Sequence, residues 1–214
     1  MKPLILLFAF MGEVCLGGGP APQRFESNVD KLVPGCFLVA PREAMDNTFA
    51  ETVILLIHRD DNGAMGLAIN RPTKIAVSRV LDDAKDARNL NDFAYAGGPV
   101  QQESVFALSR MSKKPGAAER IFNDIYLIAT RDELSKVLRA KPTTKNFRVY
   151  LGYTGWGPGQ LEHEMELGAW RILPGDDESV FDDDPSKVWP RLIDRTEMRF
   201  VRLFATPSAN QAIR

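Results

Sequence analysis

The stretch from Gly152 to Trp170, GYTGWGPGQLEHEMELGAW, constrains the fold of this chain more than any other. It follows the apolar run Phe147–Leu151, which is typical of a buried strand. We expect a tight turn at Gly155-Trp156-Gly157, followed by a helix that starts at about Pro158 and continues over Gln160 to Ala169. Pro158 would lie in the first helical turn, where its missing amide donor costs least. This stretch therefore predicts a strand, a glycine-rich turn and an acidic helix in succession.

The clearest hairpin signal lies earlier in the chain. We expect one strand over Thr52–His58, a turn over Arg59–Gly63 and a second strand over Ala64–Asn70. The first arm is continuously apolar, which indicates a strand buried on both faces. Gly63 can adopt the positive φ that such a loop needs.

Shorter elements are predicted along the rest of the chain. Further strands are expected between Pro34 and Pro41, over Phe93–Ala96, around Val105–Leu108, over Asp124–Ala129 and over Trp170–Leu173. Helices are expected over Ile75–Leu81, from an N-cap at Thr130 to about Ala140, and around Lys187–Ile193. Strands and helices are mixed without strict βαβ alternation, which favours an α+β fold.

Length and charge limit the domain organisation and the partners. The chain has 214 residues, which suits one domain over residues 31–214 after a leader over residues 1–30. Its formal net charge of -1 gives no overall basic footprint for phosphate backbones, so we expect no direct nucleic-acid partner. We expect no membrane association either.

The leader resembles a secretory signal at its start, because Lys2 precedes the apolar run PLILLFAFM. That run stops at Gly12-Glu13 and is too short to span a bilayer. We interpret the leader as a disordered extension or an over-extended gene start rather than an export signal. The two cysteines, Cys15 and Cys36, form no disulfide framework, which fits a reducing compartment, and we expect a cytoplasmic protein with Cys36 in its core.

Four sequence blocks carry a resemblance to a known family. They are, in chain order, PGCFLVAP, HRDDNGAMGLAINRP, AGGPV and RVYLGYTGWGPGQLEHEMELGAW. Through them the chain resembles the bacterial YqgE/AlgH family, although Pro41 stands where that family more often has a methionine before its proline. The resemblance implies an α+β fold with a bifurcated mixed sheet, a small barrel-like part and flanking helices. It implies no agreed catalytic residues, and the family's frequent label of transcriptional regulator names no chemistry.

Two groups of residues are candidates for binding a ligand. Gly155, Trp156, Gly157 and Gln160 lie where a helix start would expose backbone donors to an anion. Asn70 and Arg71 follow a strand, and a guanidinium can bind a carboxylate or phosphate bidentately. The structural alternative for the first group is a rigid turn around a core tryptophan. The alternative for Arg71 is an internal ion pair, for example with Asp46.

Two further constellations could carry acid–base chemistry. His58 lies beside acidic residues, and the helix places Glu162, His163 and Glu166 within reach of one another. However, the chain has no HExxH pattern and no Gly-x-Ser-x-Gly elbow, so we assign no catalytic residue, no metal and no cofactor.

These patterns favour a non-enzymatic regulatory or interaction protein with a small anionic ligand or a protein partner. A hydrolase that uses His58 or the Glu162/His163/Glu166 group is the alternative. Direct DNA binding is a third possibility, and the near-neutral charge disfavours it.

Overall fold

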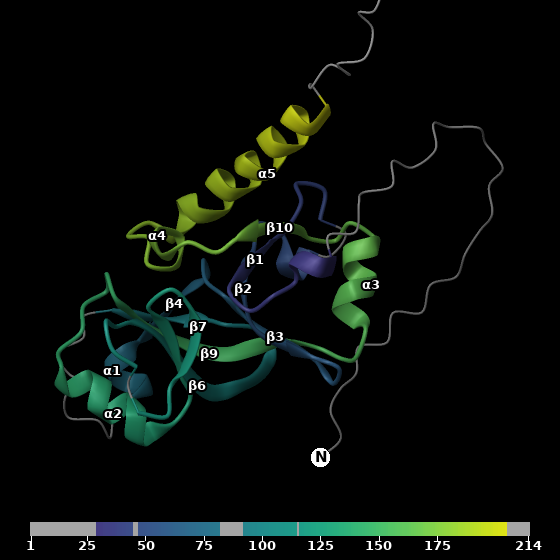
Figure 1. The fold of residues 1–214 in the computed structure, drawn as a ribbon. Helices are drawn as coiled ribbons and strands as arrows, with labels where there is room; N and C mark the ends of the chain where they lie inside the picture. The colour runs from purple at the N-terminus through teal and green to yellow at the C-terminus, as the bar shows by residue number, and fades with distance from the viewer. Residues whose placement is uncertain (1–28, 45–46, 82–91, 115, 205–214) are drawn as a thin grey trace, which may run out of the picture.

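The computed structural model describes the backbone of residues 29–44, 47–81, 92–114 and 116–204. It contains a ten-stranded sheet with helices on its outer faces (Figure 1). The strands are β1 (Cys36–Val39), β2 (Val53–Asp60), β3 (Gly63–Ala68), β4 (Pro72–Ala76), β5 (Phe93–Ala96), β6 (Val100–Arg110), β7 (Glu119–Phe122), β8 (Ile125–Ile128), β9 (Phe147–Trp156) and β10 (Arg171–Pro174). The α-helices are α1 (Val77–Val80), α2 (Arg131–Arg139), α3 (Gln160–Glu166), α4 (Asp177–Val180) and α5 (Val188–Phe204). Short 3-10 turns are η1 (Val29–Lys31), η2 (Asn47–Phe49) and η4 (Pro185–Lys187).

The sheet is mixed and branched, as the family resemblance implies. Its main path runs β10-β1-β2-β3-β9-β6-β8-β7, and a side branch pairs β4 with β5 and β5 with β9. Most pairs are antiparallel, but β5 runs parallel to β9, with Tyr95 opposite Tyr150. The α+β class with a bifurcated mixed sheet is therefore confirmed.

The sheet forks at β9, which belongs to both arms. Beside β3, β9 pairs only from Thr154 to Trp156. Past that point, the amide of Ala68 donates to the carbonyl of Gly97, and the amide of Gly97 donates to the carbonyl of Leu151. The segment after β5 is thus inserted between β3 and β9, and this insertion separates the two arms.

Gly152 lets β9 change faces as it passes from one arm to the other. Its φ is +65°, a left-handed conformation that glycine adopts without steric cost. Before Gly152, Leu151 packs toward α1 and α2, whereas Tyr153 packs toward the inside of the curled sheet. Residues two apart in a regular strand would share a face, so Gly152 acts as a bulge.

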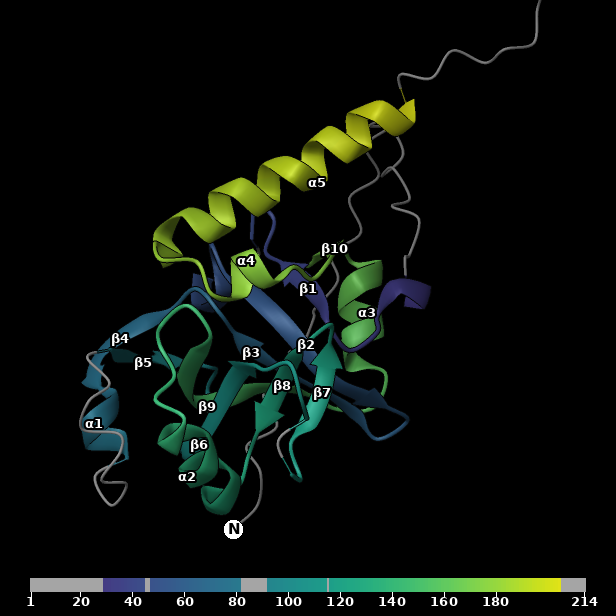
Figure 2. The ribbon, with the colours of Figure 1, turned by 60° about the vertical axis from the view of Figure 1, so that its left-hand side comes forward.

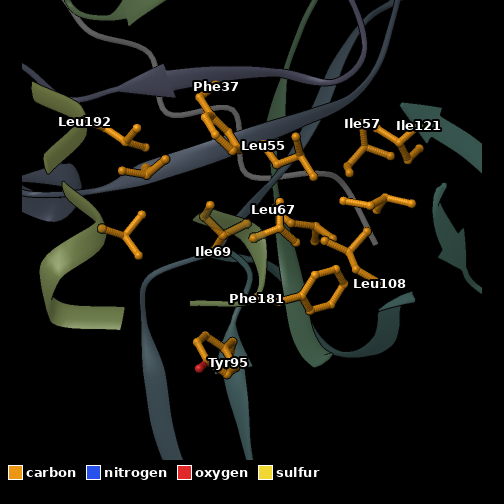
Figure 3. Close-up of a cluster of buried hydrophobic side chains, with 14 of the residues drawn as sticks. Phe37, Leu55, Ile57, Leu67, Ile69, Tyr95, Leu108, Ile121, Phe181 and Leu192 are labelled. Atoms are coloured by element: carbon orange, nitrogen blue, oxygen red, sulfur yellow. The ribbon is translucent and has the colours of Figure 1, made fainter. Parts of the chain in front are cut away.

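The sheet curls around an inner core, the hydrophobic cluster shown in Figure 3. Phe37 of β1 lies near one end of the strand order and Ile121 of β7 lies at the other end, yet both belong to this cluster. The helices α4 and α5 cover the open side with Val180, Trp189 and Leu192. The curl is the barrel-like part that the resemblance implies.

Two further clusters fill the outer faces of the sheet. The α3 core packs Leu38 and Ile54 against Leu161 of α3. The α1–α2 core packs Val149 against Leu138 of α2, at the end of the molecule away from α5 (Figure 2). Residues Val53 to Ile57 have no exposed surface, which confirms that this strand is buried on both faces.

Two element predictions were wrong. The turn predicted at Gly155-Trp156-Gly157 is strand through Trp156, because Ala64 and Met65 of β3 pair with this segment. Consequently α3 begins only at Gln160, after Gly159 at φ +71°, and Pro158 precedes the helix rather than starting it.

The helix predicted over Ile75–Leu81 is also corrected. Its first residues complete β4, because Ala76 pairs with Phe93 of β5, and only Val77–Val80 is helical. The Thr130 cap is confirmed, since its side-chain oxygen accepts a hydrogen bond from the Glu133 amide. Among the described helices, none is both long and apolar enough to cross a bilayer.

Candidate functional site

The glycine-rich motifs AGGPV and GYTGW pack against each other at the fork of the sheet. A Cβ on Gly98 would lie 2.2 Å from the carbonyl carbon of Tyr153. A Cβ on Gly152 would lie 2.7 Å from the carbonyl oxygen of Gly98. Both glycines are thus required where two backbones approach without room for a side chain.

Trp156 is hydrogen-bonded through its indole to a carboxylate of α3. Its Nε1 donates to Oε2 of Glu164 at 2.9 Å, and Nε1 of Trp170 donates to the same oxygen at 2.9 Å. The two indole rings meet edge to face, with centroids 6.3 Å apart. We call Trp156, Trp170 and Glu164 the tryptophan clasp.

Gln160 and Gly157 extend the clasp. Gln160 donates from Nε2 to Oε1 of Glu164 at 2.9 Å and accepts the Gly157 amide hydrogen at 3.1 Å. The backbone donor of Gly157 that we expected to face an anion is therefore hydrogen-bonded to a side chain of α3.

Asn70 and Arg71 bind the backbone that enters β2. Asn70 accepts from the Val53 amide at 2.9 Å and donates to the Glu51 carbonyl at 2.9 Å. Arg71 donates from Nη2 to the Ala50 carbonyl at 2.7 Å and from Nε to Thr52 Oγ1 at 3.1 Å. Asp46, the partner suggested for Arg71, lies outside the described residues.

The structure does not bring these two groups of residues together. Trp156 lies opposite Ala64 at the start of β3, whereas Asn70 follows the end of that strand. An extended chain spans about 20 Å between Ala64 and Asn70. Ligand binding by either group remains a prediction, and any such binding would have to occur at two separate places.

The acid–base candidates lie on separate elements, and both histidines face solvent. The His58 side chain is 53% exposed, with Nε2 3.3 Å from Oδ2 of Asp60. His163 Nδ1 lies 3.8 Å from Oε2 of Glu166. In the described part of the chain, His, Cys, Asp and Glu form no group of three or more that could hold a metal ion.

Glu162 and Cys36 have defined internal roles. Glu162 accepts a hydrogen bond from Nε of Arg59 at 2.6 Å. Partial burial raises the pKa of Glu162, but the hydrogen bond from its own backbone amide and the nearby Arg59 together lower it by more. The pKa of Glu162 is therefore below its ordinary value. Burial raises the pKa of the Cys36 thiol to about 11, which keeps this core residue protonated and unreactive near neutral pH.

A cavity of about 310 Å³ lies at the start of α2, and we call it the α2 cavity. It opens between α1, β6 and the segment that joins β8 to α2. Its lining combines apolar with polar residues: Val80, Leu81, Val105, Ile128, Ala129 and Leu134, with Glu103, Thr130, Arg131 and Ser135.

Sequence reasoning missed the α2 cavity because three segments that are separate in the sequence form it. Only Thr130 carried a local signal, and that signal was its capping role. The remaining lining residues read as ordinary strand and helix positions, and only tertiary packing brings Val80 near Ile128.

The fork, the curl and the outer helices define an α+β protein of the forked half-barrel type. The profile of the AlgH-like family matches residues 37–201. The chain is 34% identical over 166 residues to a UPF0301 protein of Chlorobium limicola, and the aligned region covers 77% of this chain and 87% of that protein. It is 33% identical over 177 residues to a UPF0301 protein of Caulobacter vibrioides, and the aligned region covers 80% of this chain and 91% of that protein.

Solved structures agree with this assignment. The solution structure of the AlgH protein from Pseudomonas aeruginosa has a TM-score of 0.65 and 28% identity, covering 85% of this chain and 95% of that one. The crystal structure of a Corynebacterium diphtheriae protein has a TM-score of 0.65 and 25% identity, covering 76% and 86%. The chain therefore belongs to the AlgH-like family.

Proposed function

We propose that this protein is a non-enzymatic, cytoplasmic binding protein whose ligand site is the α2 cavity. The observation that carries the proposal is the volume of that cavity, about 310 Å³. Small-molecule sites range upward from about 300 Å³ and combine apolar walls with a few polar groups. The free, buried Cys36 supports a reducing compartment.

The lining favours a compact ligand with an apolar body and a polar end. Val105, Ile128 and Leu134 offer apolar surface, and burial of such surface contributes about 25 cal/mol per Å². Thr130 and Ser135 offer hydroxyl groups that would orient the polar end. Because Leu134 also belongs to the α1–α2 core, a bound ligand would stabilise α2 against the sheet.

A thermal-shift screen of small amphiphilic metabolites tests the proposal. A ligand at about 100 times its Kd stabilises a protein by about 2.7 kcal/mol, which raises Tm by several degrees in a chain of this size. The Ser135→Trp variant places a large ring at the rim of the α2 cavity and should abolish the shift. Arg139→Trp is the matched control, because Arg139 is on the same helix, exposed and outside the lining.

Hits that stabilise the wild type and Arg139→Trp, but not Ser135→Trp, would support the α2 cavity as the site. Equal stabilisation of both variants would place binding elsewhere, and Gly157→Ala and Arg71→Lys would then test the two predicted groups. Turnover of a hit that stops in His58→Ala would contradict the non-enzymatic assignment.

A further inference from the structure

Arg148 is a buried cation that ties β9 to the C-terminal part of the chain. Its side chain is 2% exposed. Its Nη1 donates to the Val180 carbonyl at 2.9 Å, and its Nη2 donates to the Asp182 carbonyl. The guanidinium carbon lies 4.8 Å from the centre of the Tyr95 ring. These contacts engage both terminal nitrogens of the guanidinium.

The third nitrogen of the Arg148 guanidinium is unpaired within the described part of the chain. Its Nε is buried and has no hydrogen-bond partner there. The hydroxyl of Tyr150 is also buried without a partner among the described residues. Tyr150 has no exposed surface, and this burial raises its pKa, so the hydroxyl keeps its proton.

The two unpaired donors share one side of β9. Arg148 and Tyr150 are two residues apart before the bulge at Gly152, so their side chains lie on the same face. Both contact the same neighbour, because the Tyr150 and Tyr95 rings are 5.6 Å apart. Figure 3 shows Tyr95 at the edge of the inner core.

An unpaired buried donor destabilises a fold, so two on one face of β9, beside the same Tyr95 ring, call for a common acceptor. A water molecule can accept two hydrogen bonds, and buried waters bind in polar sites of this kind. Besides burial, the negative charges of Asp92 and Asp182 raise the pKa of the neighbouring Tyr95 hydroxyl. These carboxylates therefore disfavour an anion at this place. Asp182 itself is paired with Arg191 at 2.6 Å.

We propose that Nε of Arg148 and the hydroxyl of Tyr150 hold one internal water molecule as a permanent part of the fold. This water completes the hydrogen bonding of Arg148, which joins β9 to the end of α4. The site lies on the inner face of β9 and is separate from the α2 cavity, whose lining belongs to the opposite face of the sheet.

The Tyr150→Phe variant tests the proposal because it removes only the hydroxyl. Loss of a satisfied buried hydrogen bond should lower Tm by about 2–4 °C. An unchanged or higher Tm would show that the hydroxyl has no partner and would overturn the proposal. Tyr126→Phe, at a buried tyrosine of the α1–α2 core, is the control for removing a hydroxyl from a packed ring.

Two further measurements keep the proposal falsifiable. In the Arg148→Lys background, which lacks Nε, the Tm loss caused by Tyr150→Phe should shrink. If Arg148→Lys does not fold, a crystal structure of the wild type decides. Density for a water molecule within about 3.2 Å of both Nε of Arg148 and the hydroxyl oxygen of Tyr150 supports the proposal. A dry contact, or a Tm difference that depends on chloride rather than on ionic strength, overturns it.

Discussion

At the scale of the residue, Glu164 organises more of the local structure than any other side chain of α3. One of its oxygens accepts from both Trp156 and Trp170, and the other accepts from Gln160. Hydrogen bonds to a charged acceptor are about twice as strong as neutral ones. The acidic helix thus supplies a structural acceptor at the point where we expected an anion site.

Replacing Glu164 by Gln should lower the free energy of unfolding by about 1–2 kcal/mol, because a neutral amide oxygen is a weaker acceptor for two indoles. Urea unfolding followed by tryptophan fluorescence measures this loss directly. Glu166→Gln is the matched control on the same helix. Its side chain is 63% exposed, so its effect should stay within about 0.5 kcal/mol. Similar losses in both variants would contradict the role of the tryptophan clasp.

The sequence offered a core tryptophan as the structural alternative for Trp156, but it did not indicate what binds its indole. The i, i+4 spacing pointed to Glu162 and Glu166 as a pair, whereas Glu164 faces inward to both tryptophans. Trp170 is brought to that carboxylate by the turn after α3, and side-chain spacing along one helix cannot reveal this. The residues of the α2 cavity were hidden for the same reason.

At the scale of the element, β9 joins the two arms of the sheet. Its composition predicted a strand that ends near Leu151 and a turn around Trp156. Gly155 and Gly157 suggested a turn because glycine is common there, yet the strand continues through Trp156, and it is Gly152 that permits a close backbone contact within it. Local patterns cannot distinguish the two uses, because the difference lies in the partner, here Gly98 and β3.

Gly152→Ala should destabilise the protein by at least about 2 kcal/mol, because a Cβ would meet two backbone oxygens and the residue has positive φ. Gly157→Ala is the control within the same motif. A Cβ there would have Gln160 Oε1 as its nearest neighbour, at 3.9 Å. Thermal unfolding of both variants checks the difference, and comparable Tm values would contradict the bulge as the reason for this glycine.

At the scale of the whole molecule, the inner core links strands from both ends of the sheet. The hairpin of β2 and β3, the α+β class and the bifurcated sheet could all be predicted from the sequence and the family resemblance. The sequence itself could not reveal the curl, because Phe37 and Ile121 enter one hydrophobic cluster only through the accumulated twist of the intervening strands.

The shared core should make the domain unfold as one cooperative unit. In a Trp189→Phe variant, the remaining tryptophans report on the α3 core, while far-UV circular dichroism reports on the whole sheet. The two urea transitions should have the same midpoint, as two-state unfolding requires. An earlier fluorescence transition would show that the β1–β3 arm unfolds independently.

The position of β9 in the chain also governs when the domain can form during synthesis. It begins at residue 147 of 214, after every other strand except β10 has left the ribosome. Until then the apolar β2–β3 hairpin lacks the strand that connects it to β6 and β8. Because such late, long-range pairing leaves apolar edges unpaired in the nascent chain, we expect aggregation to compete with folding until β9 is complete.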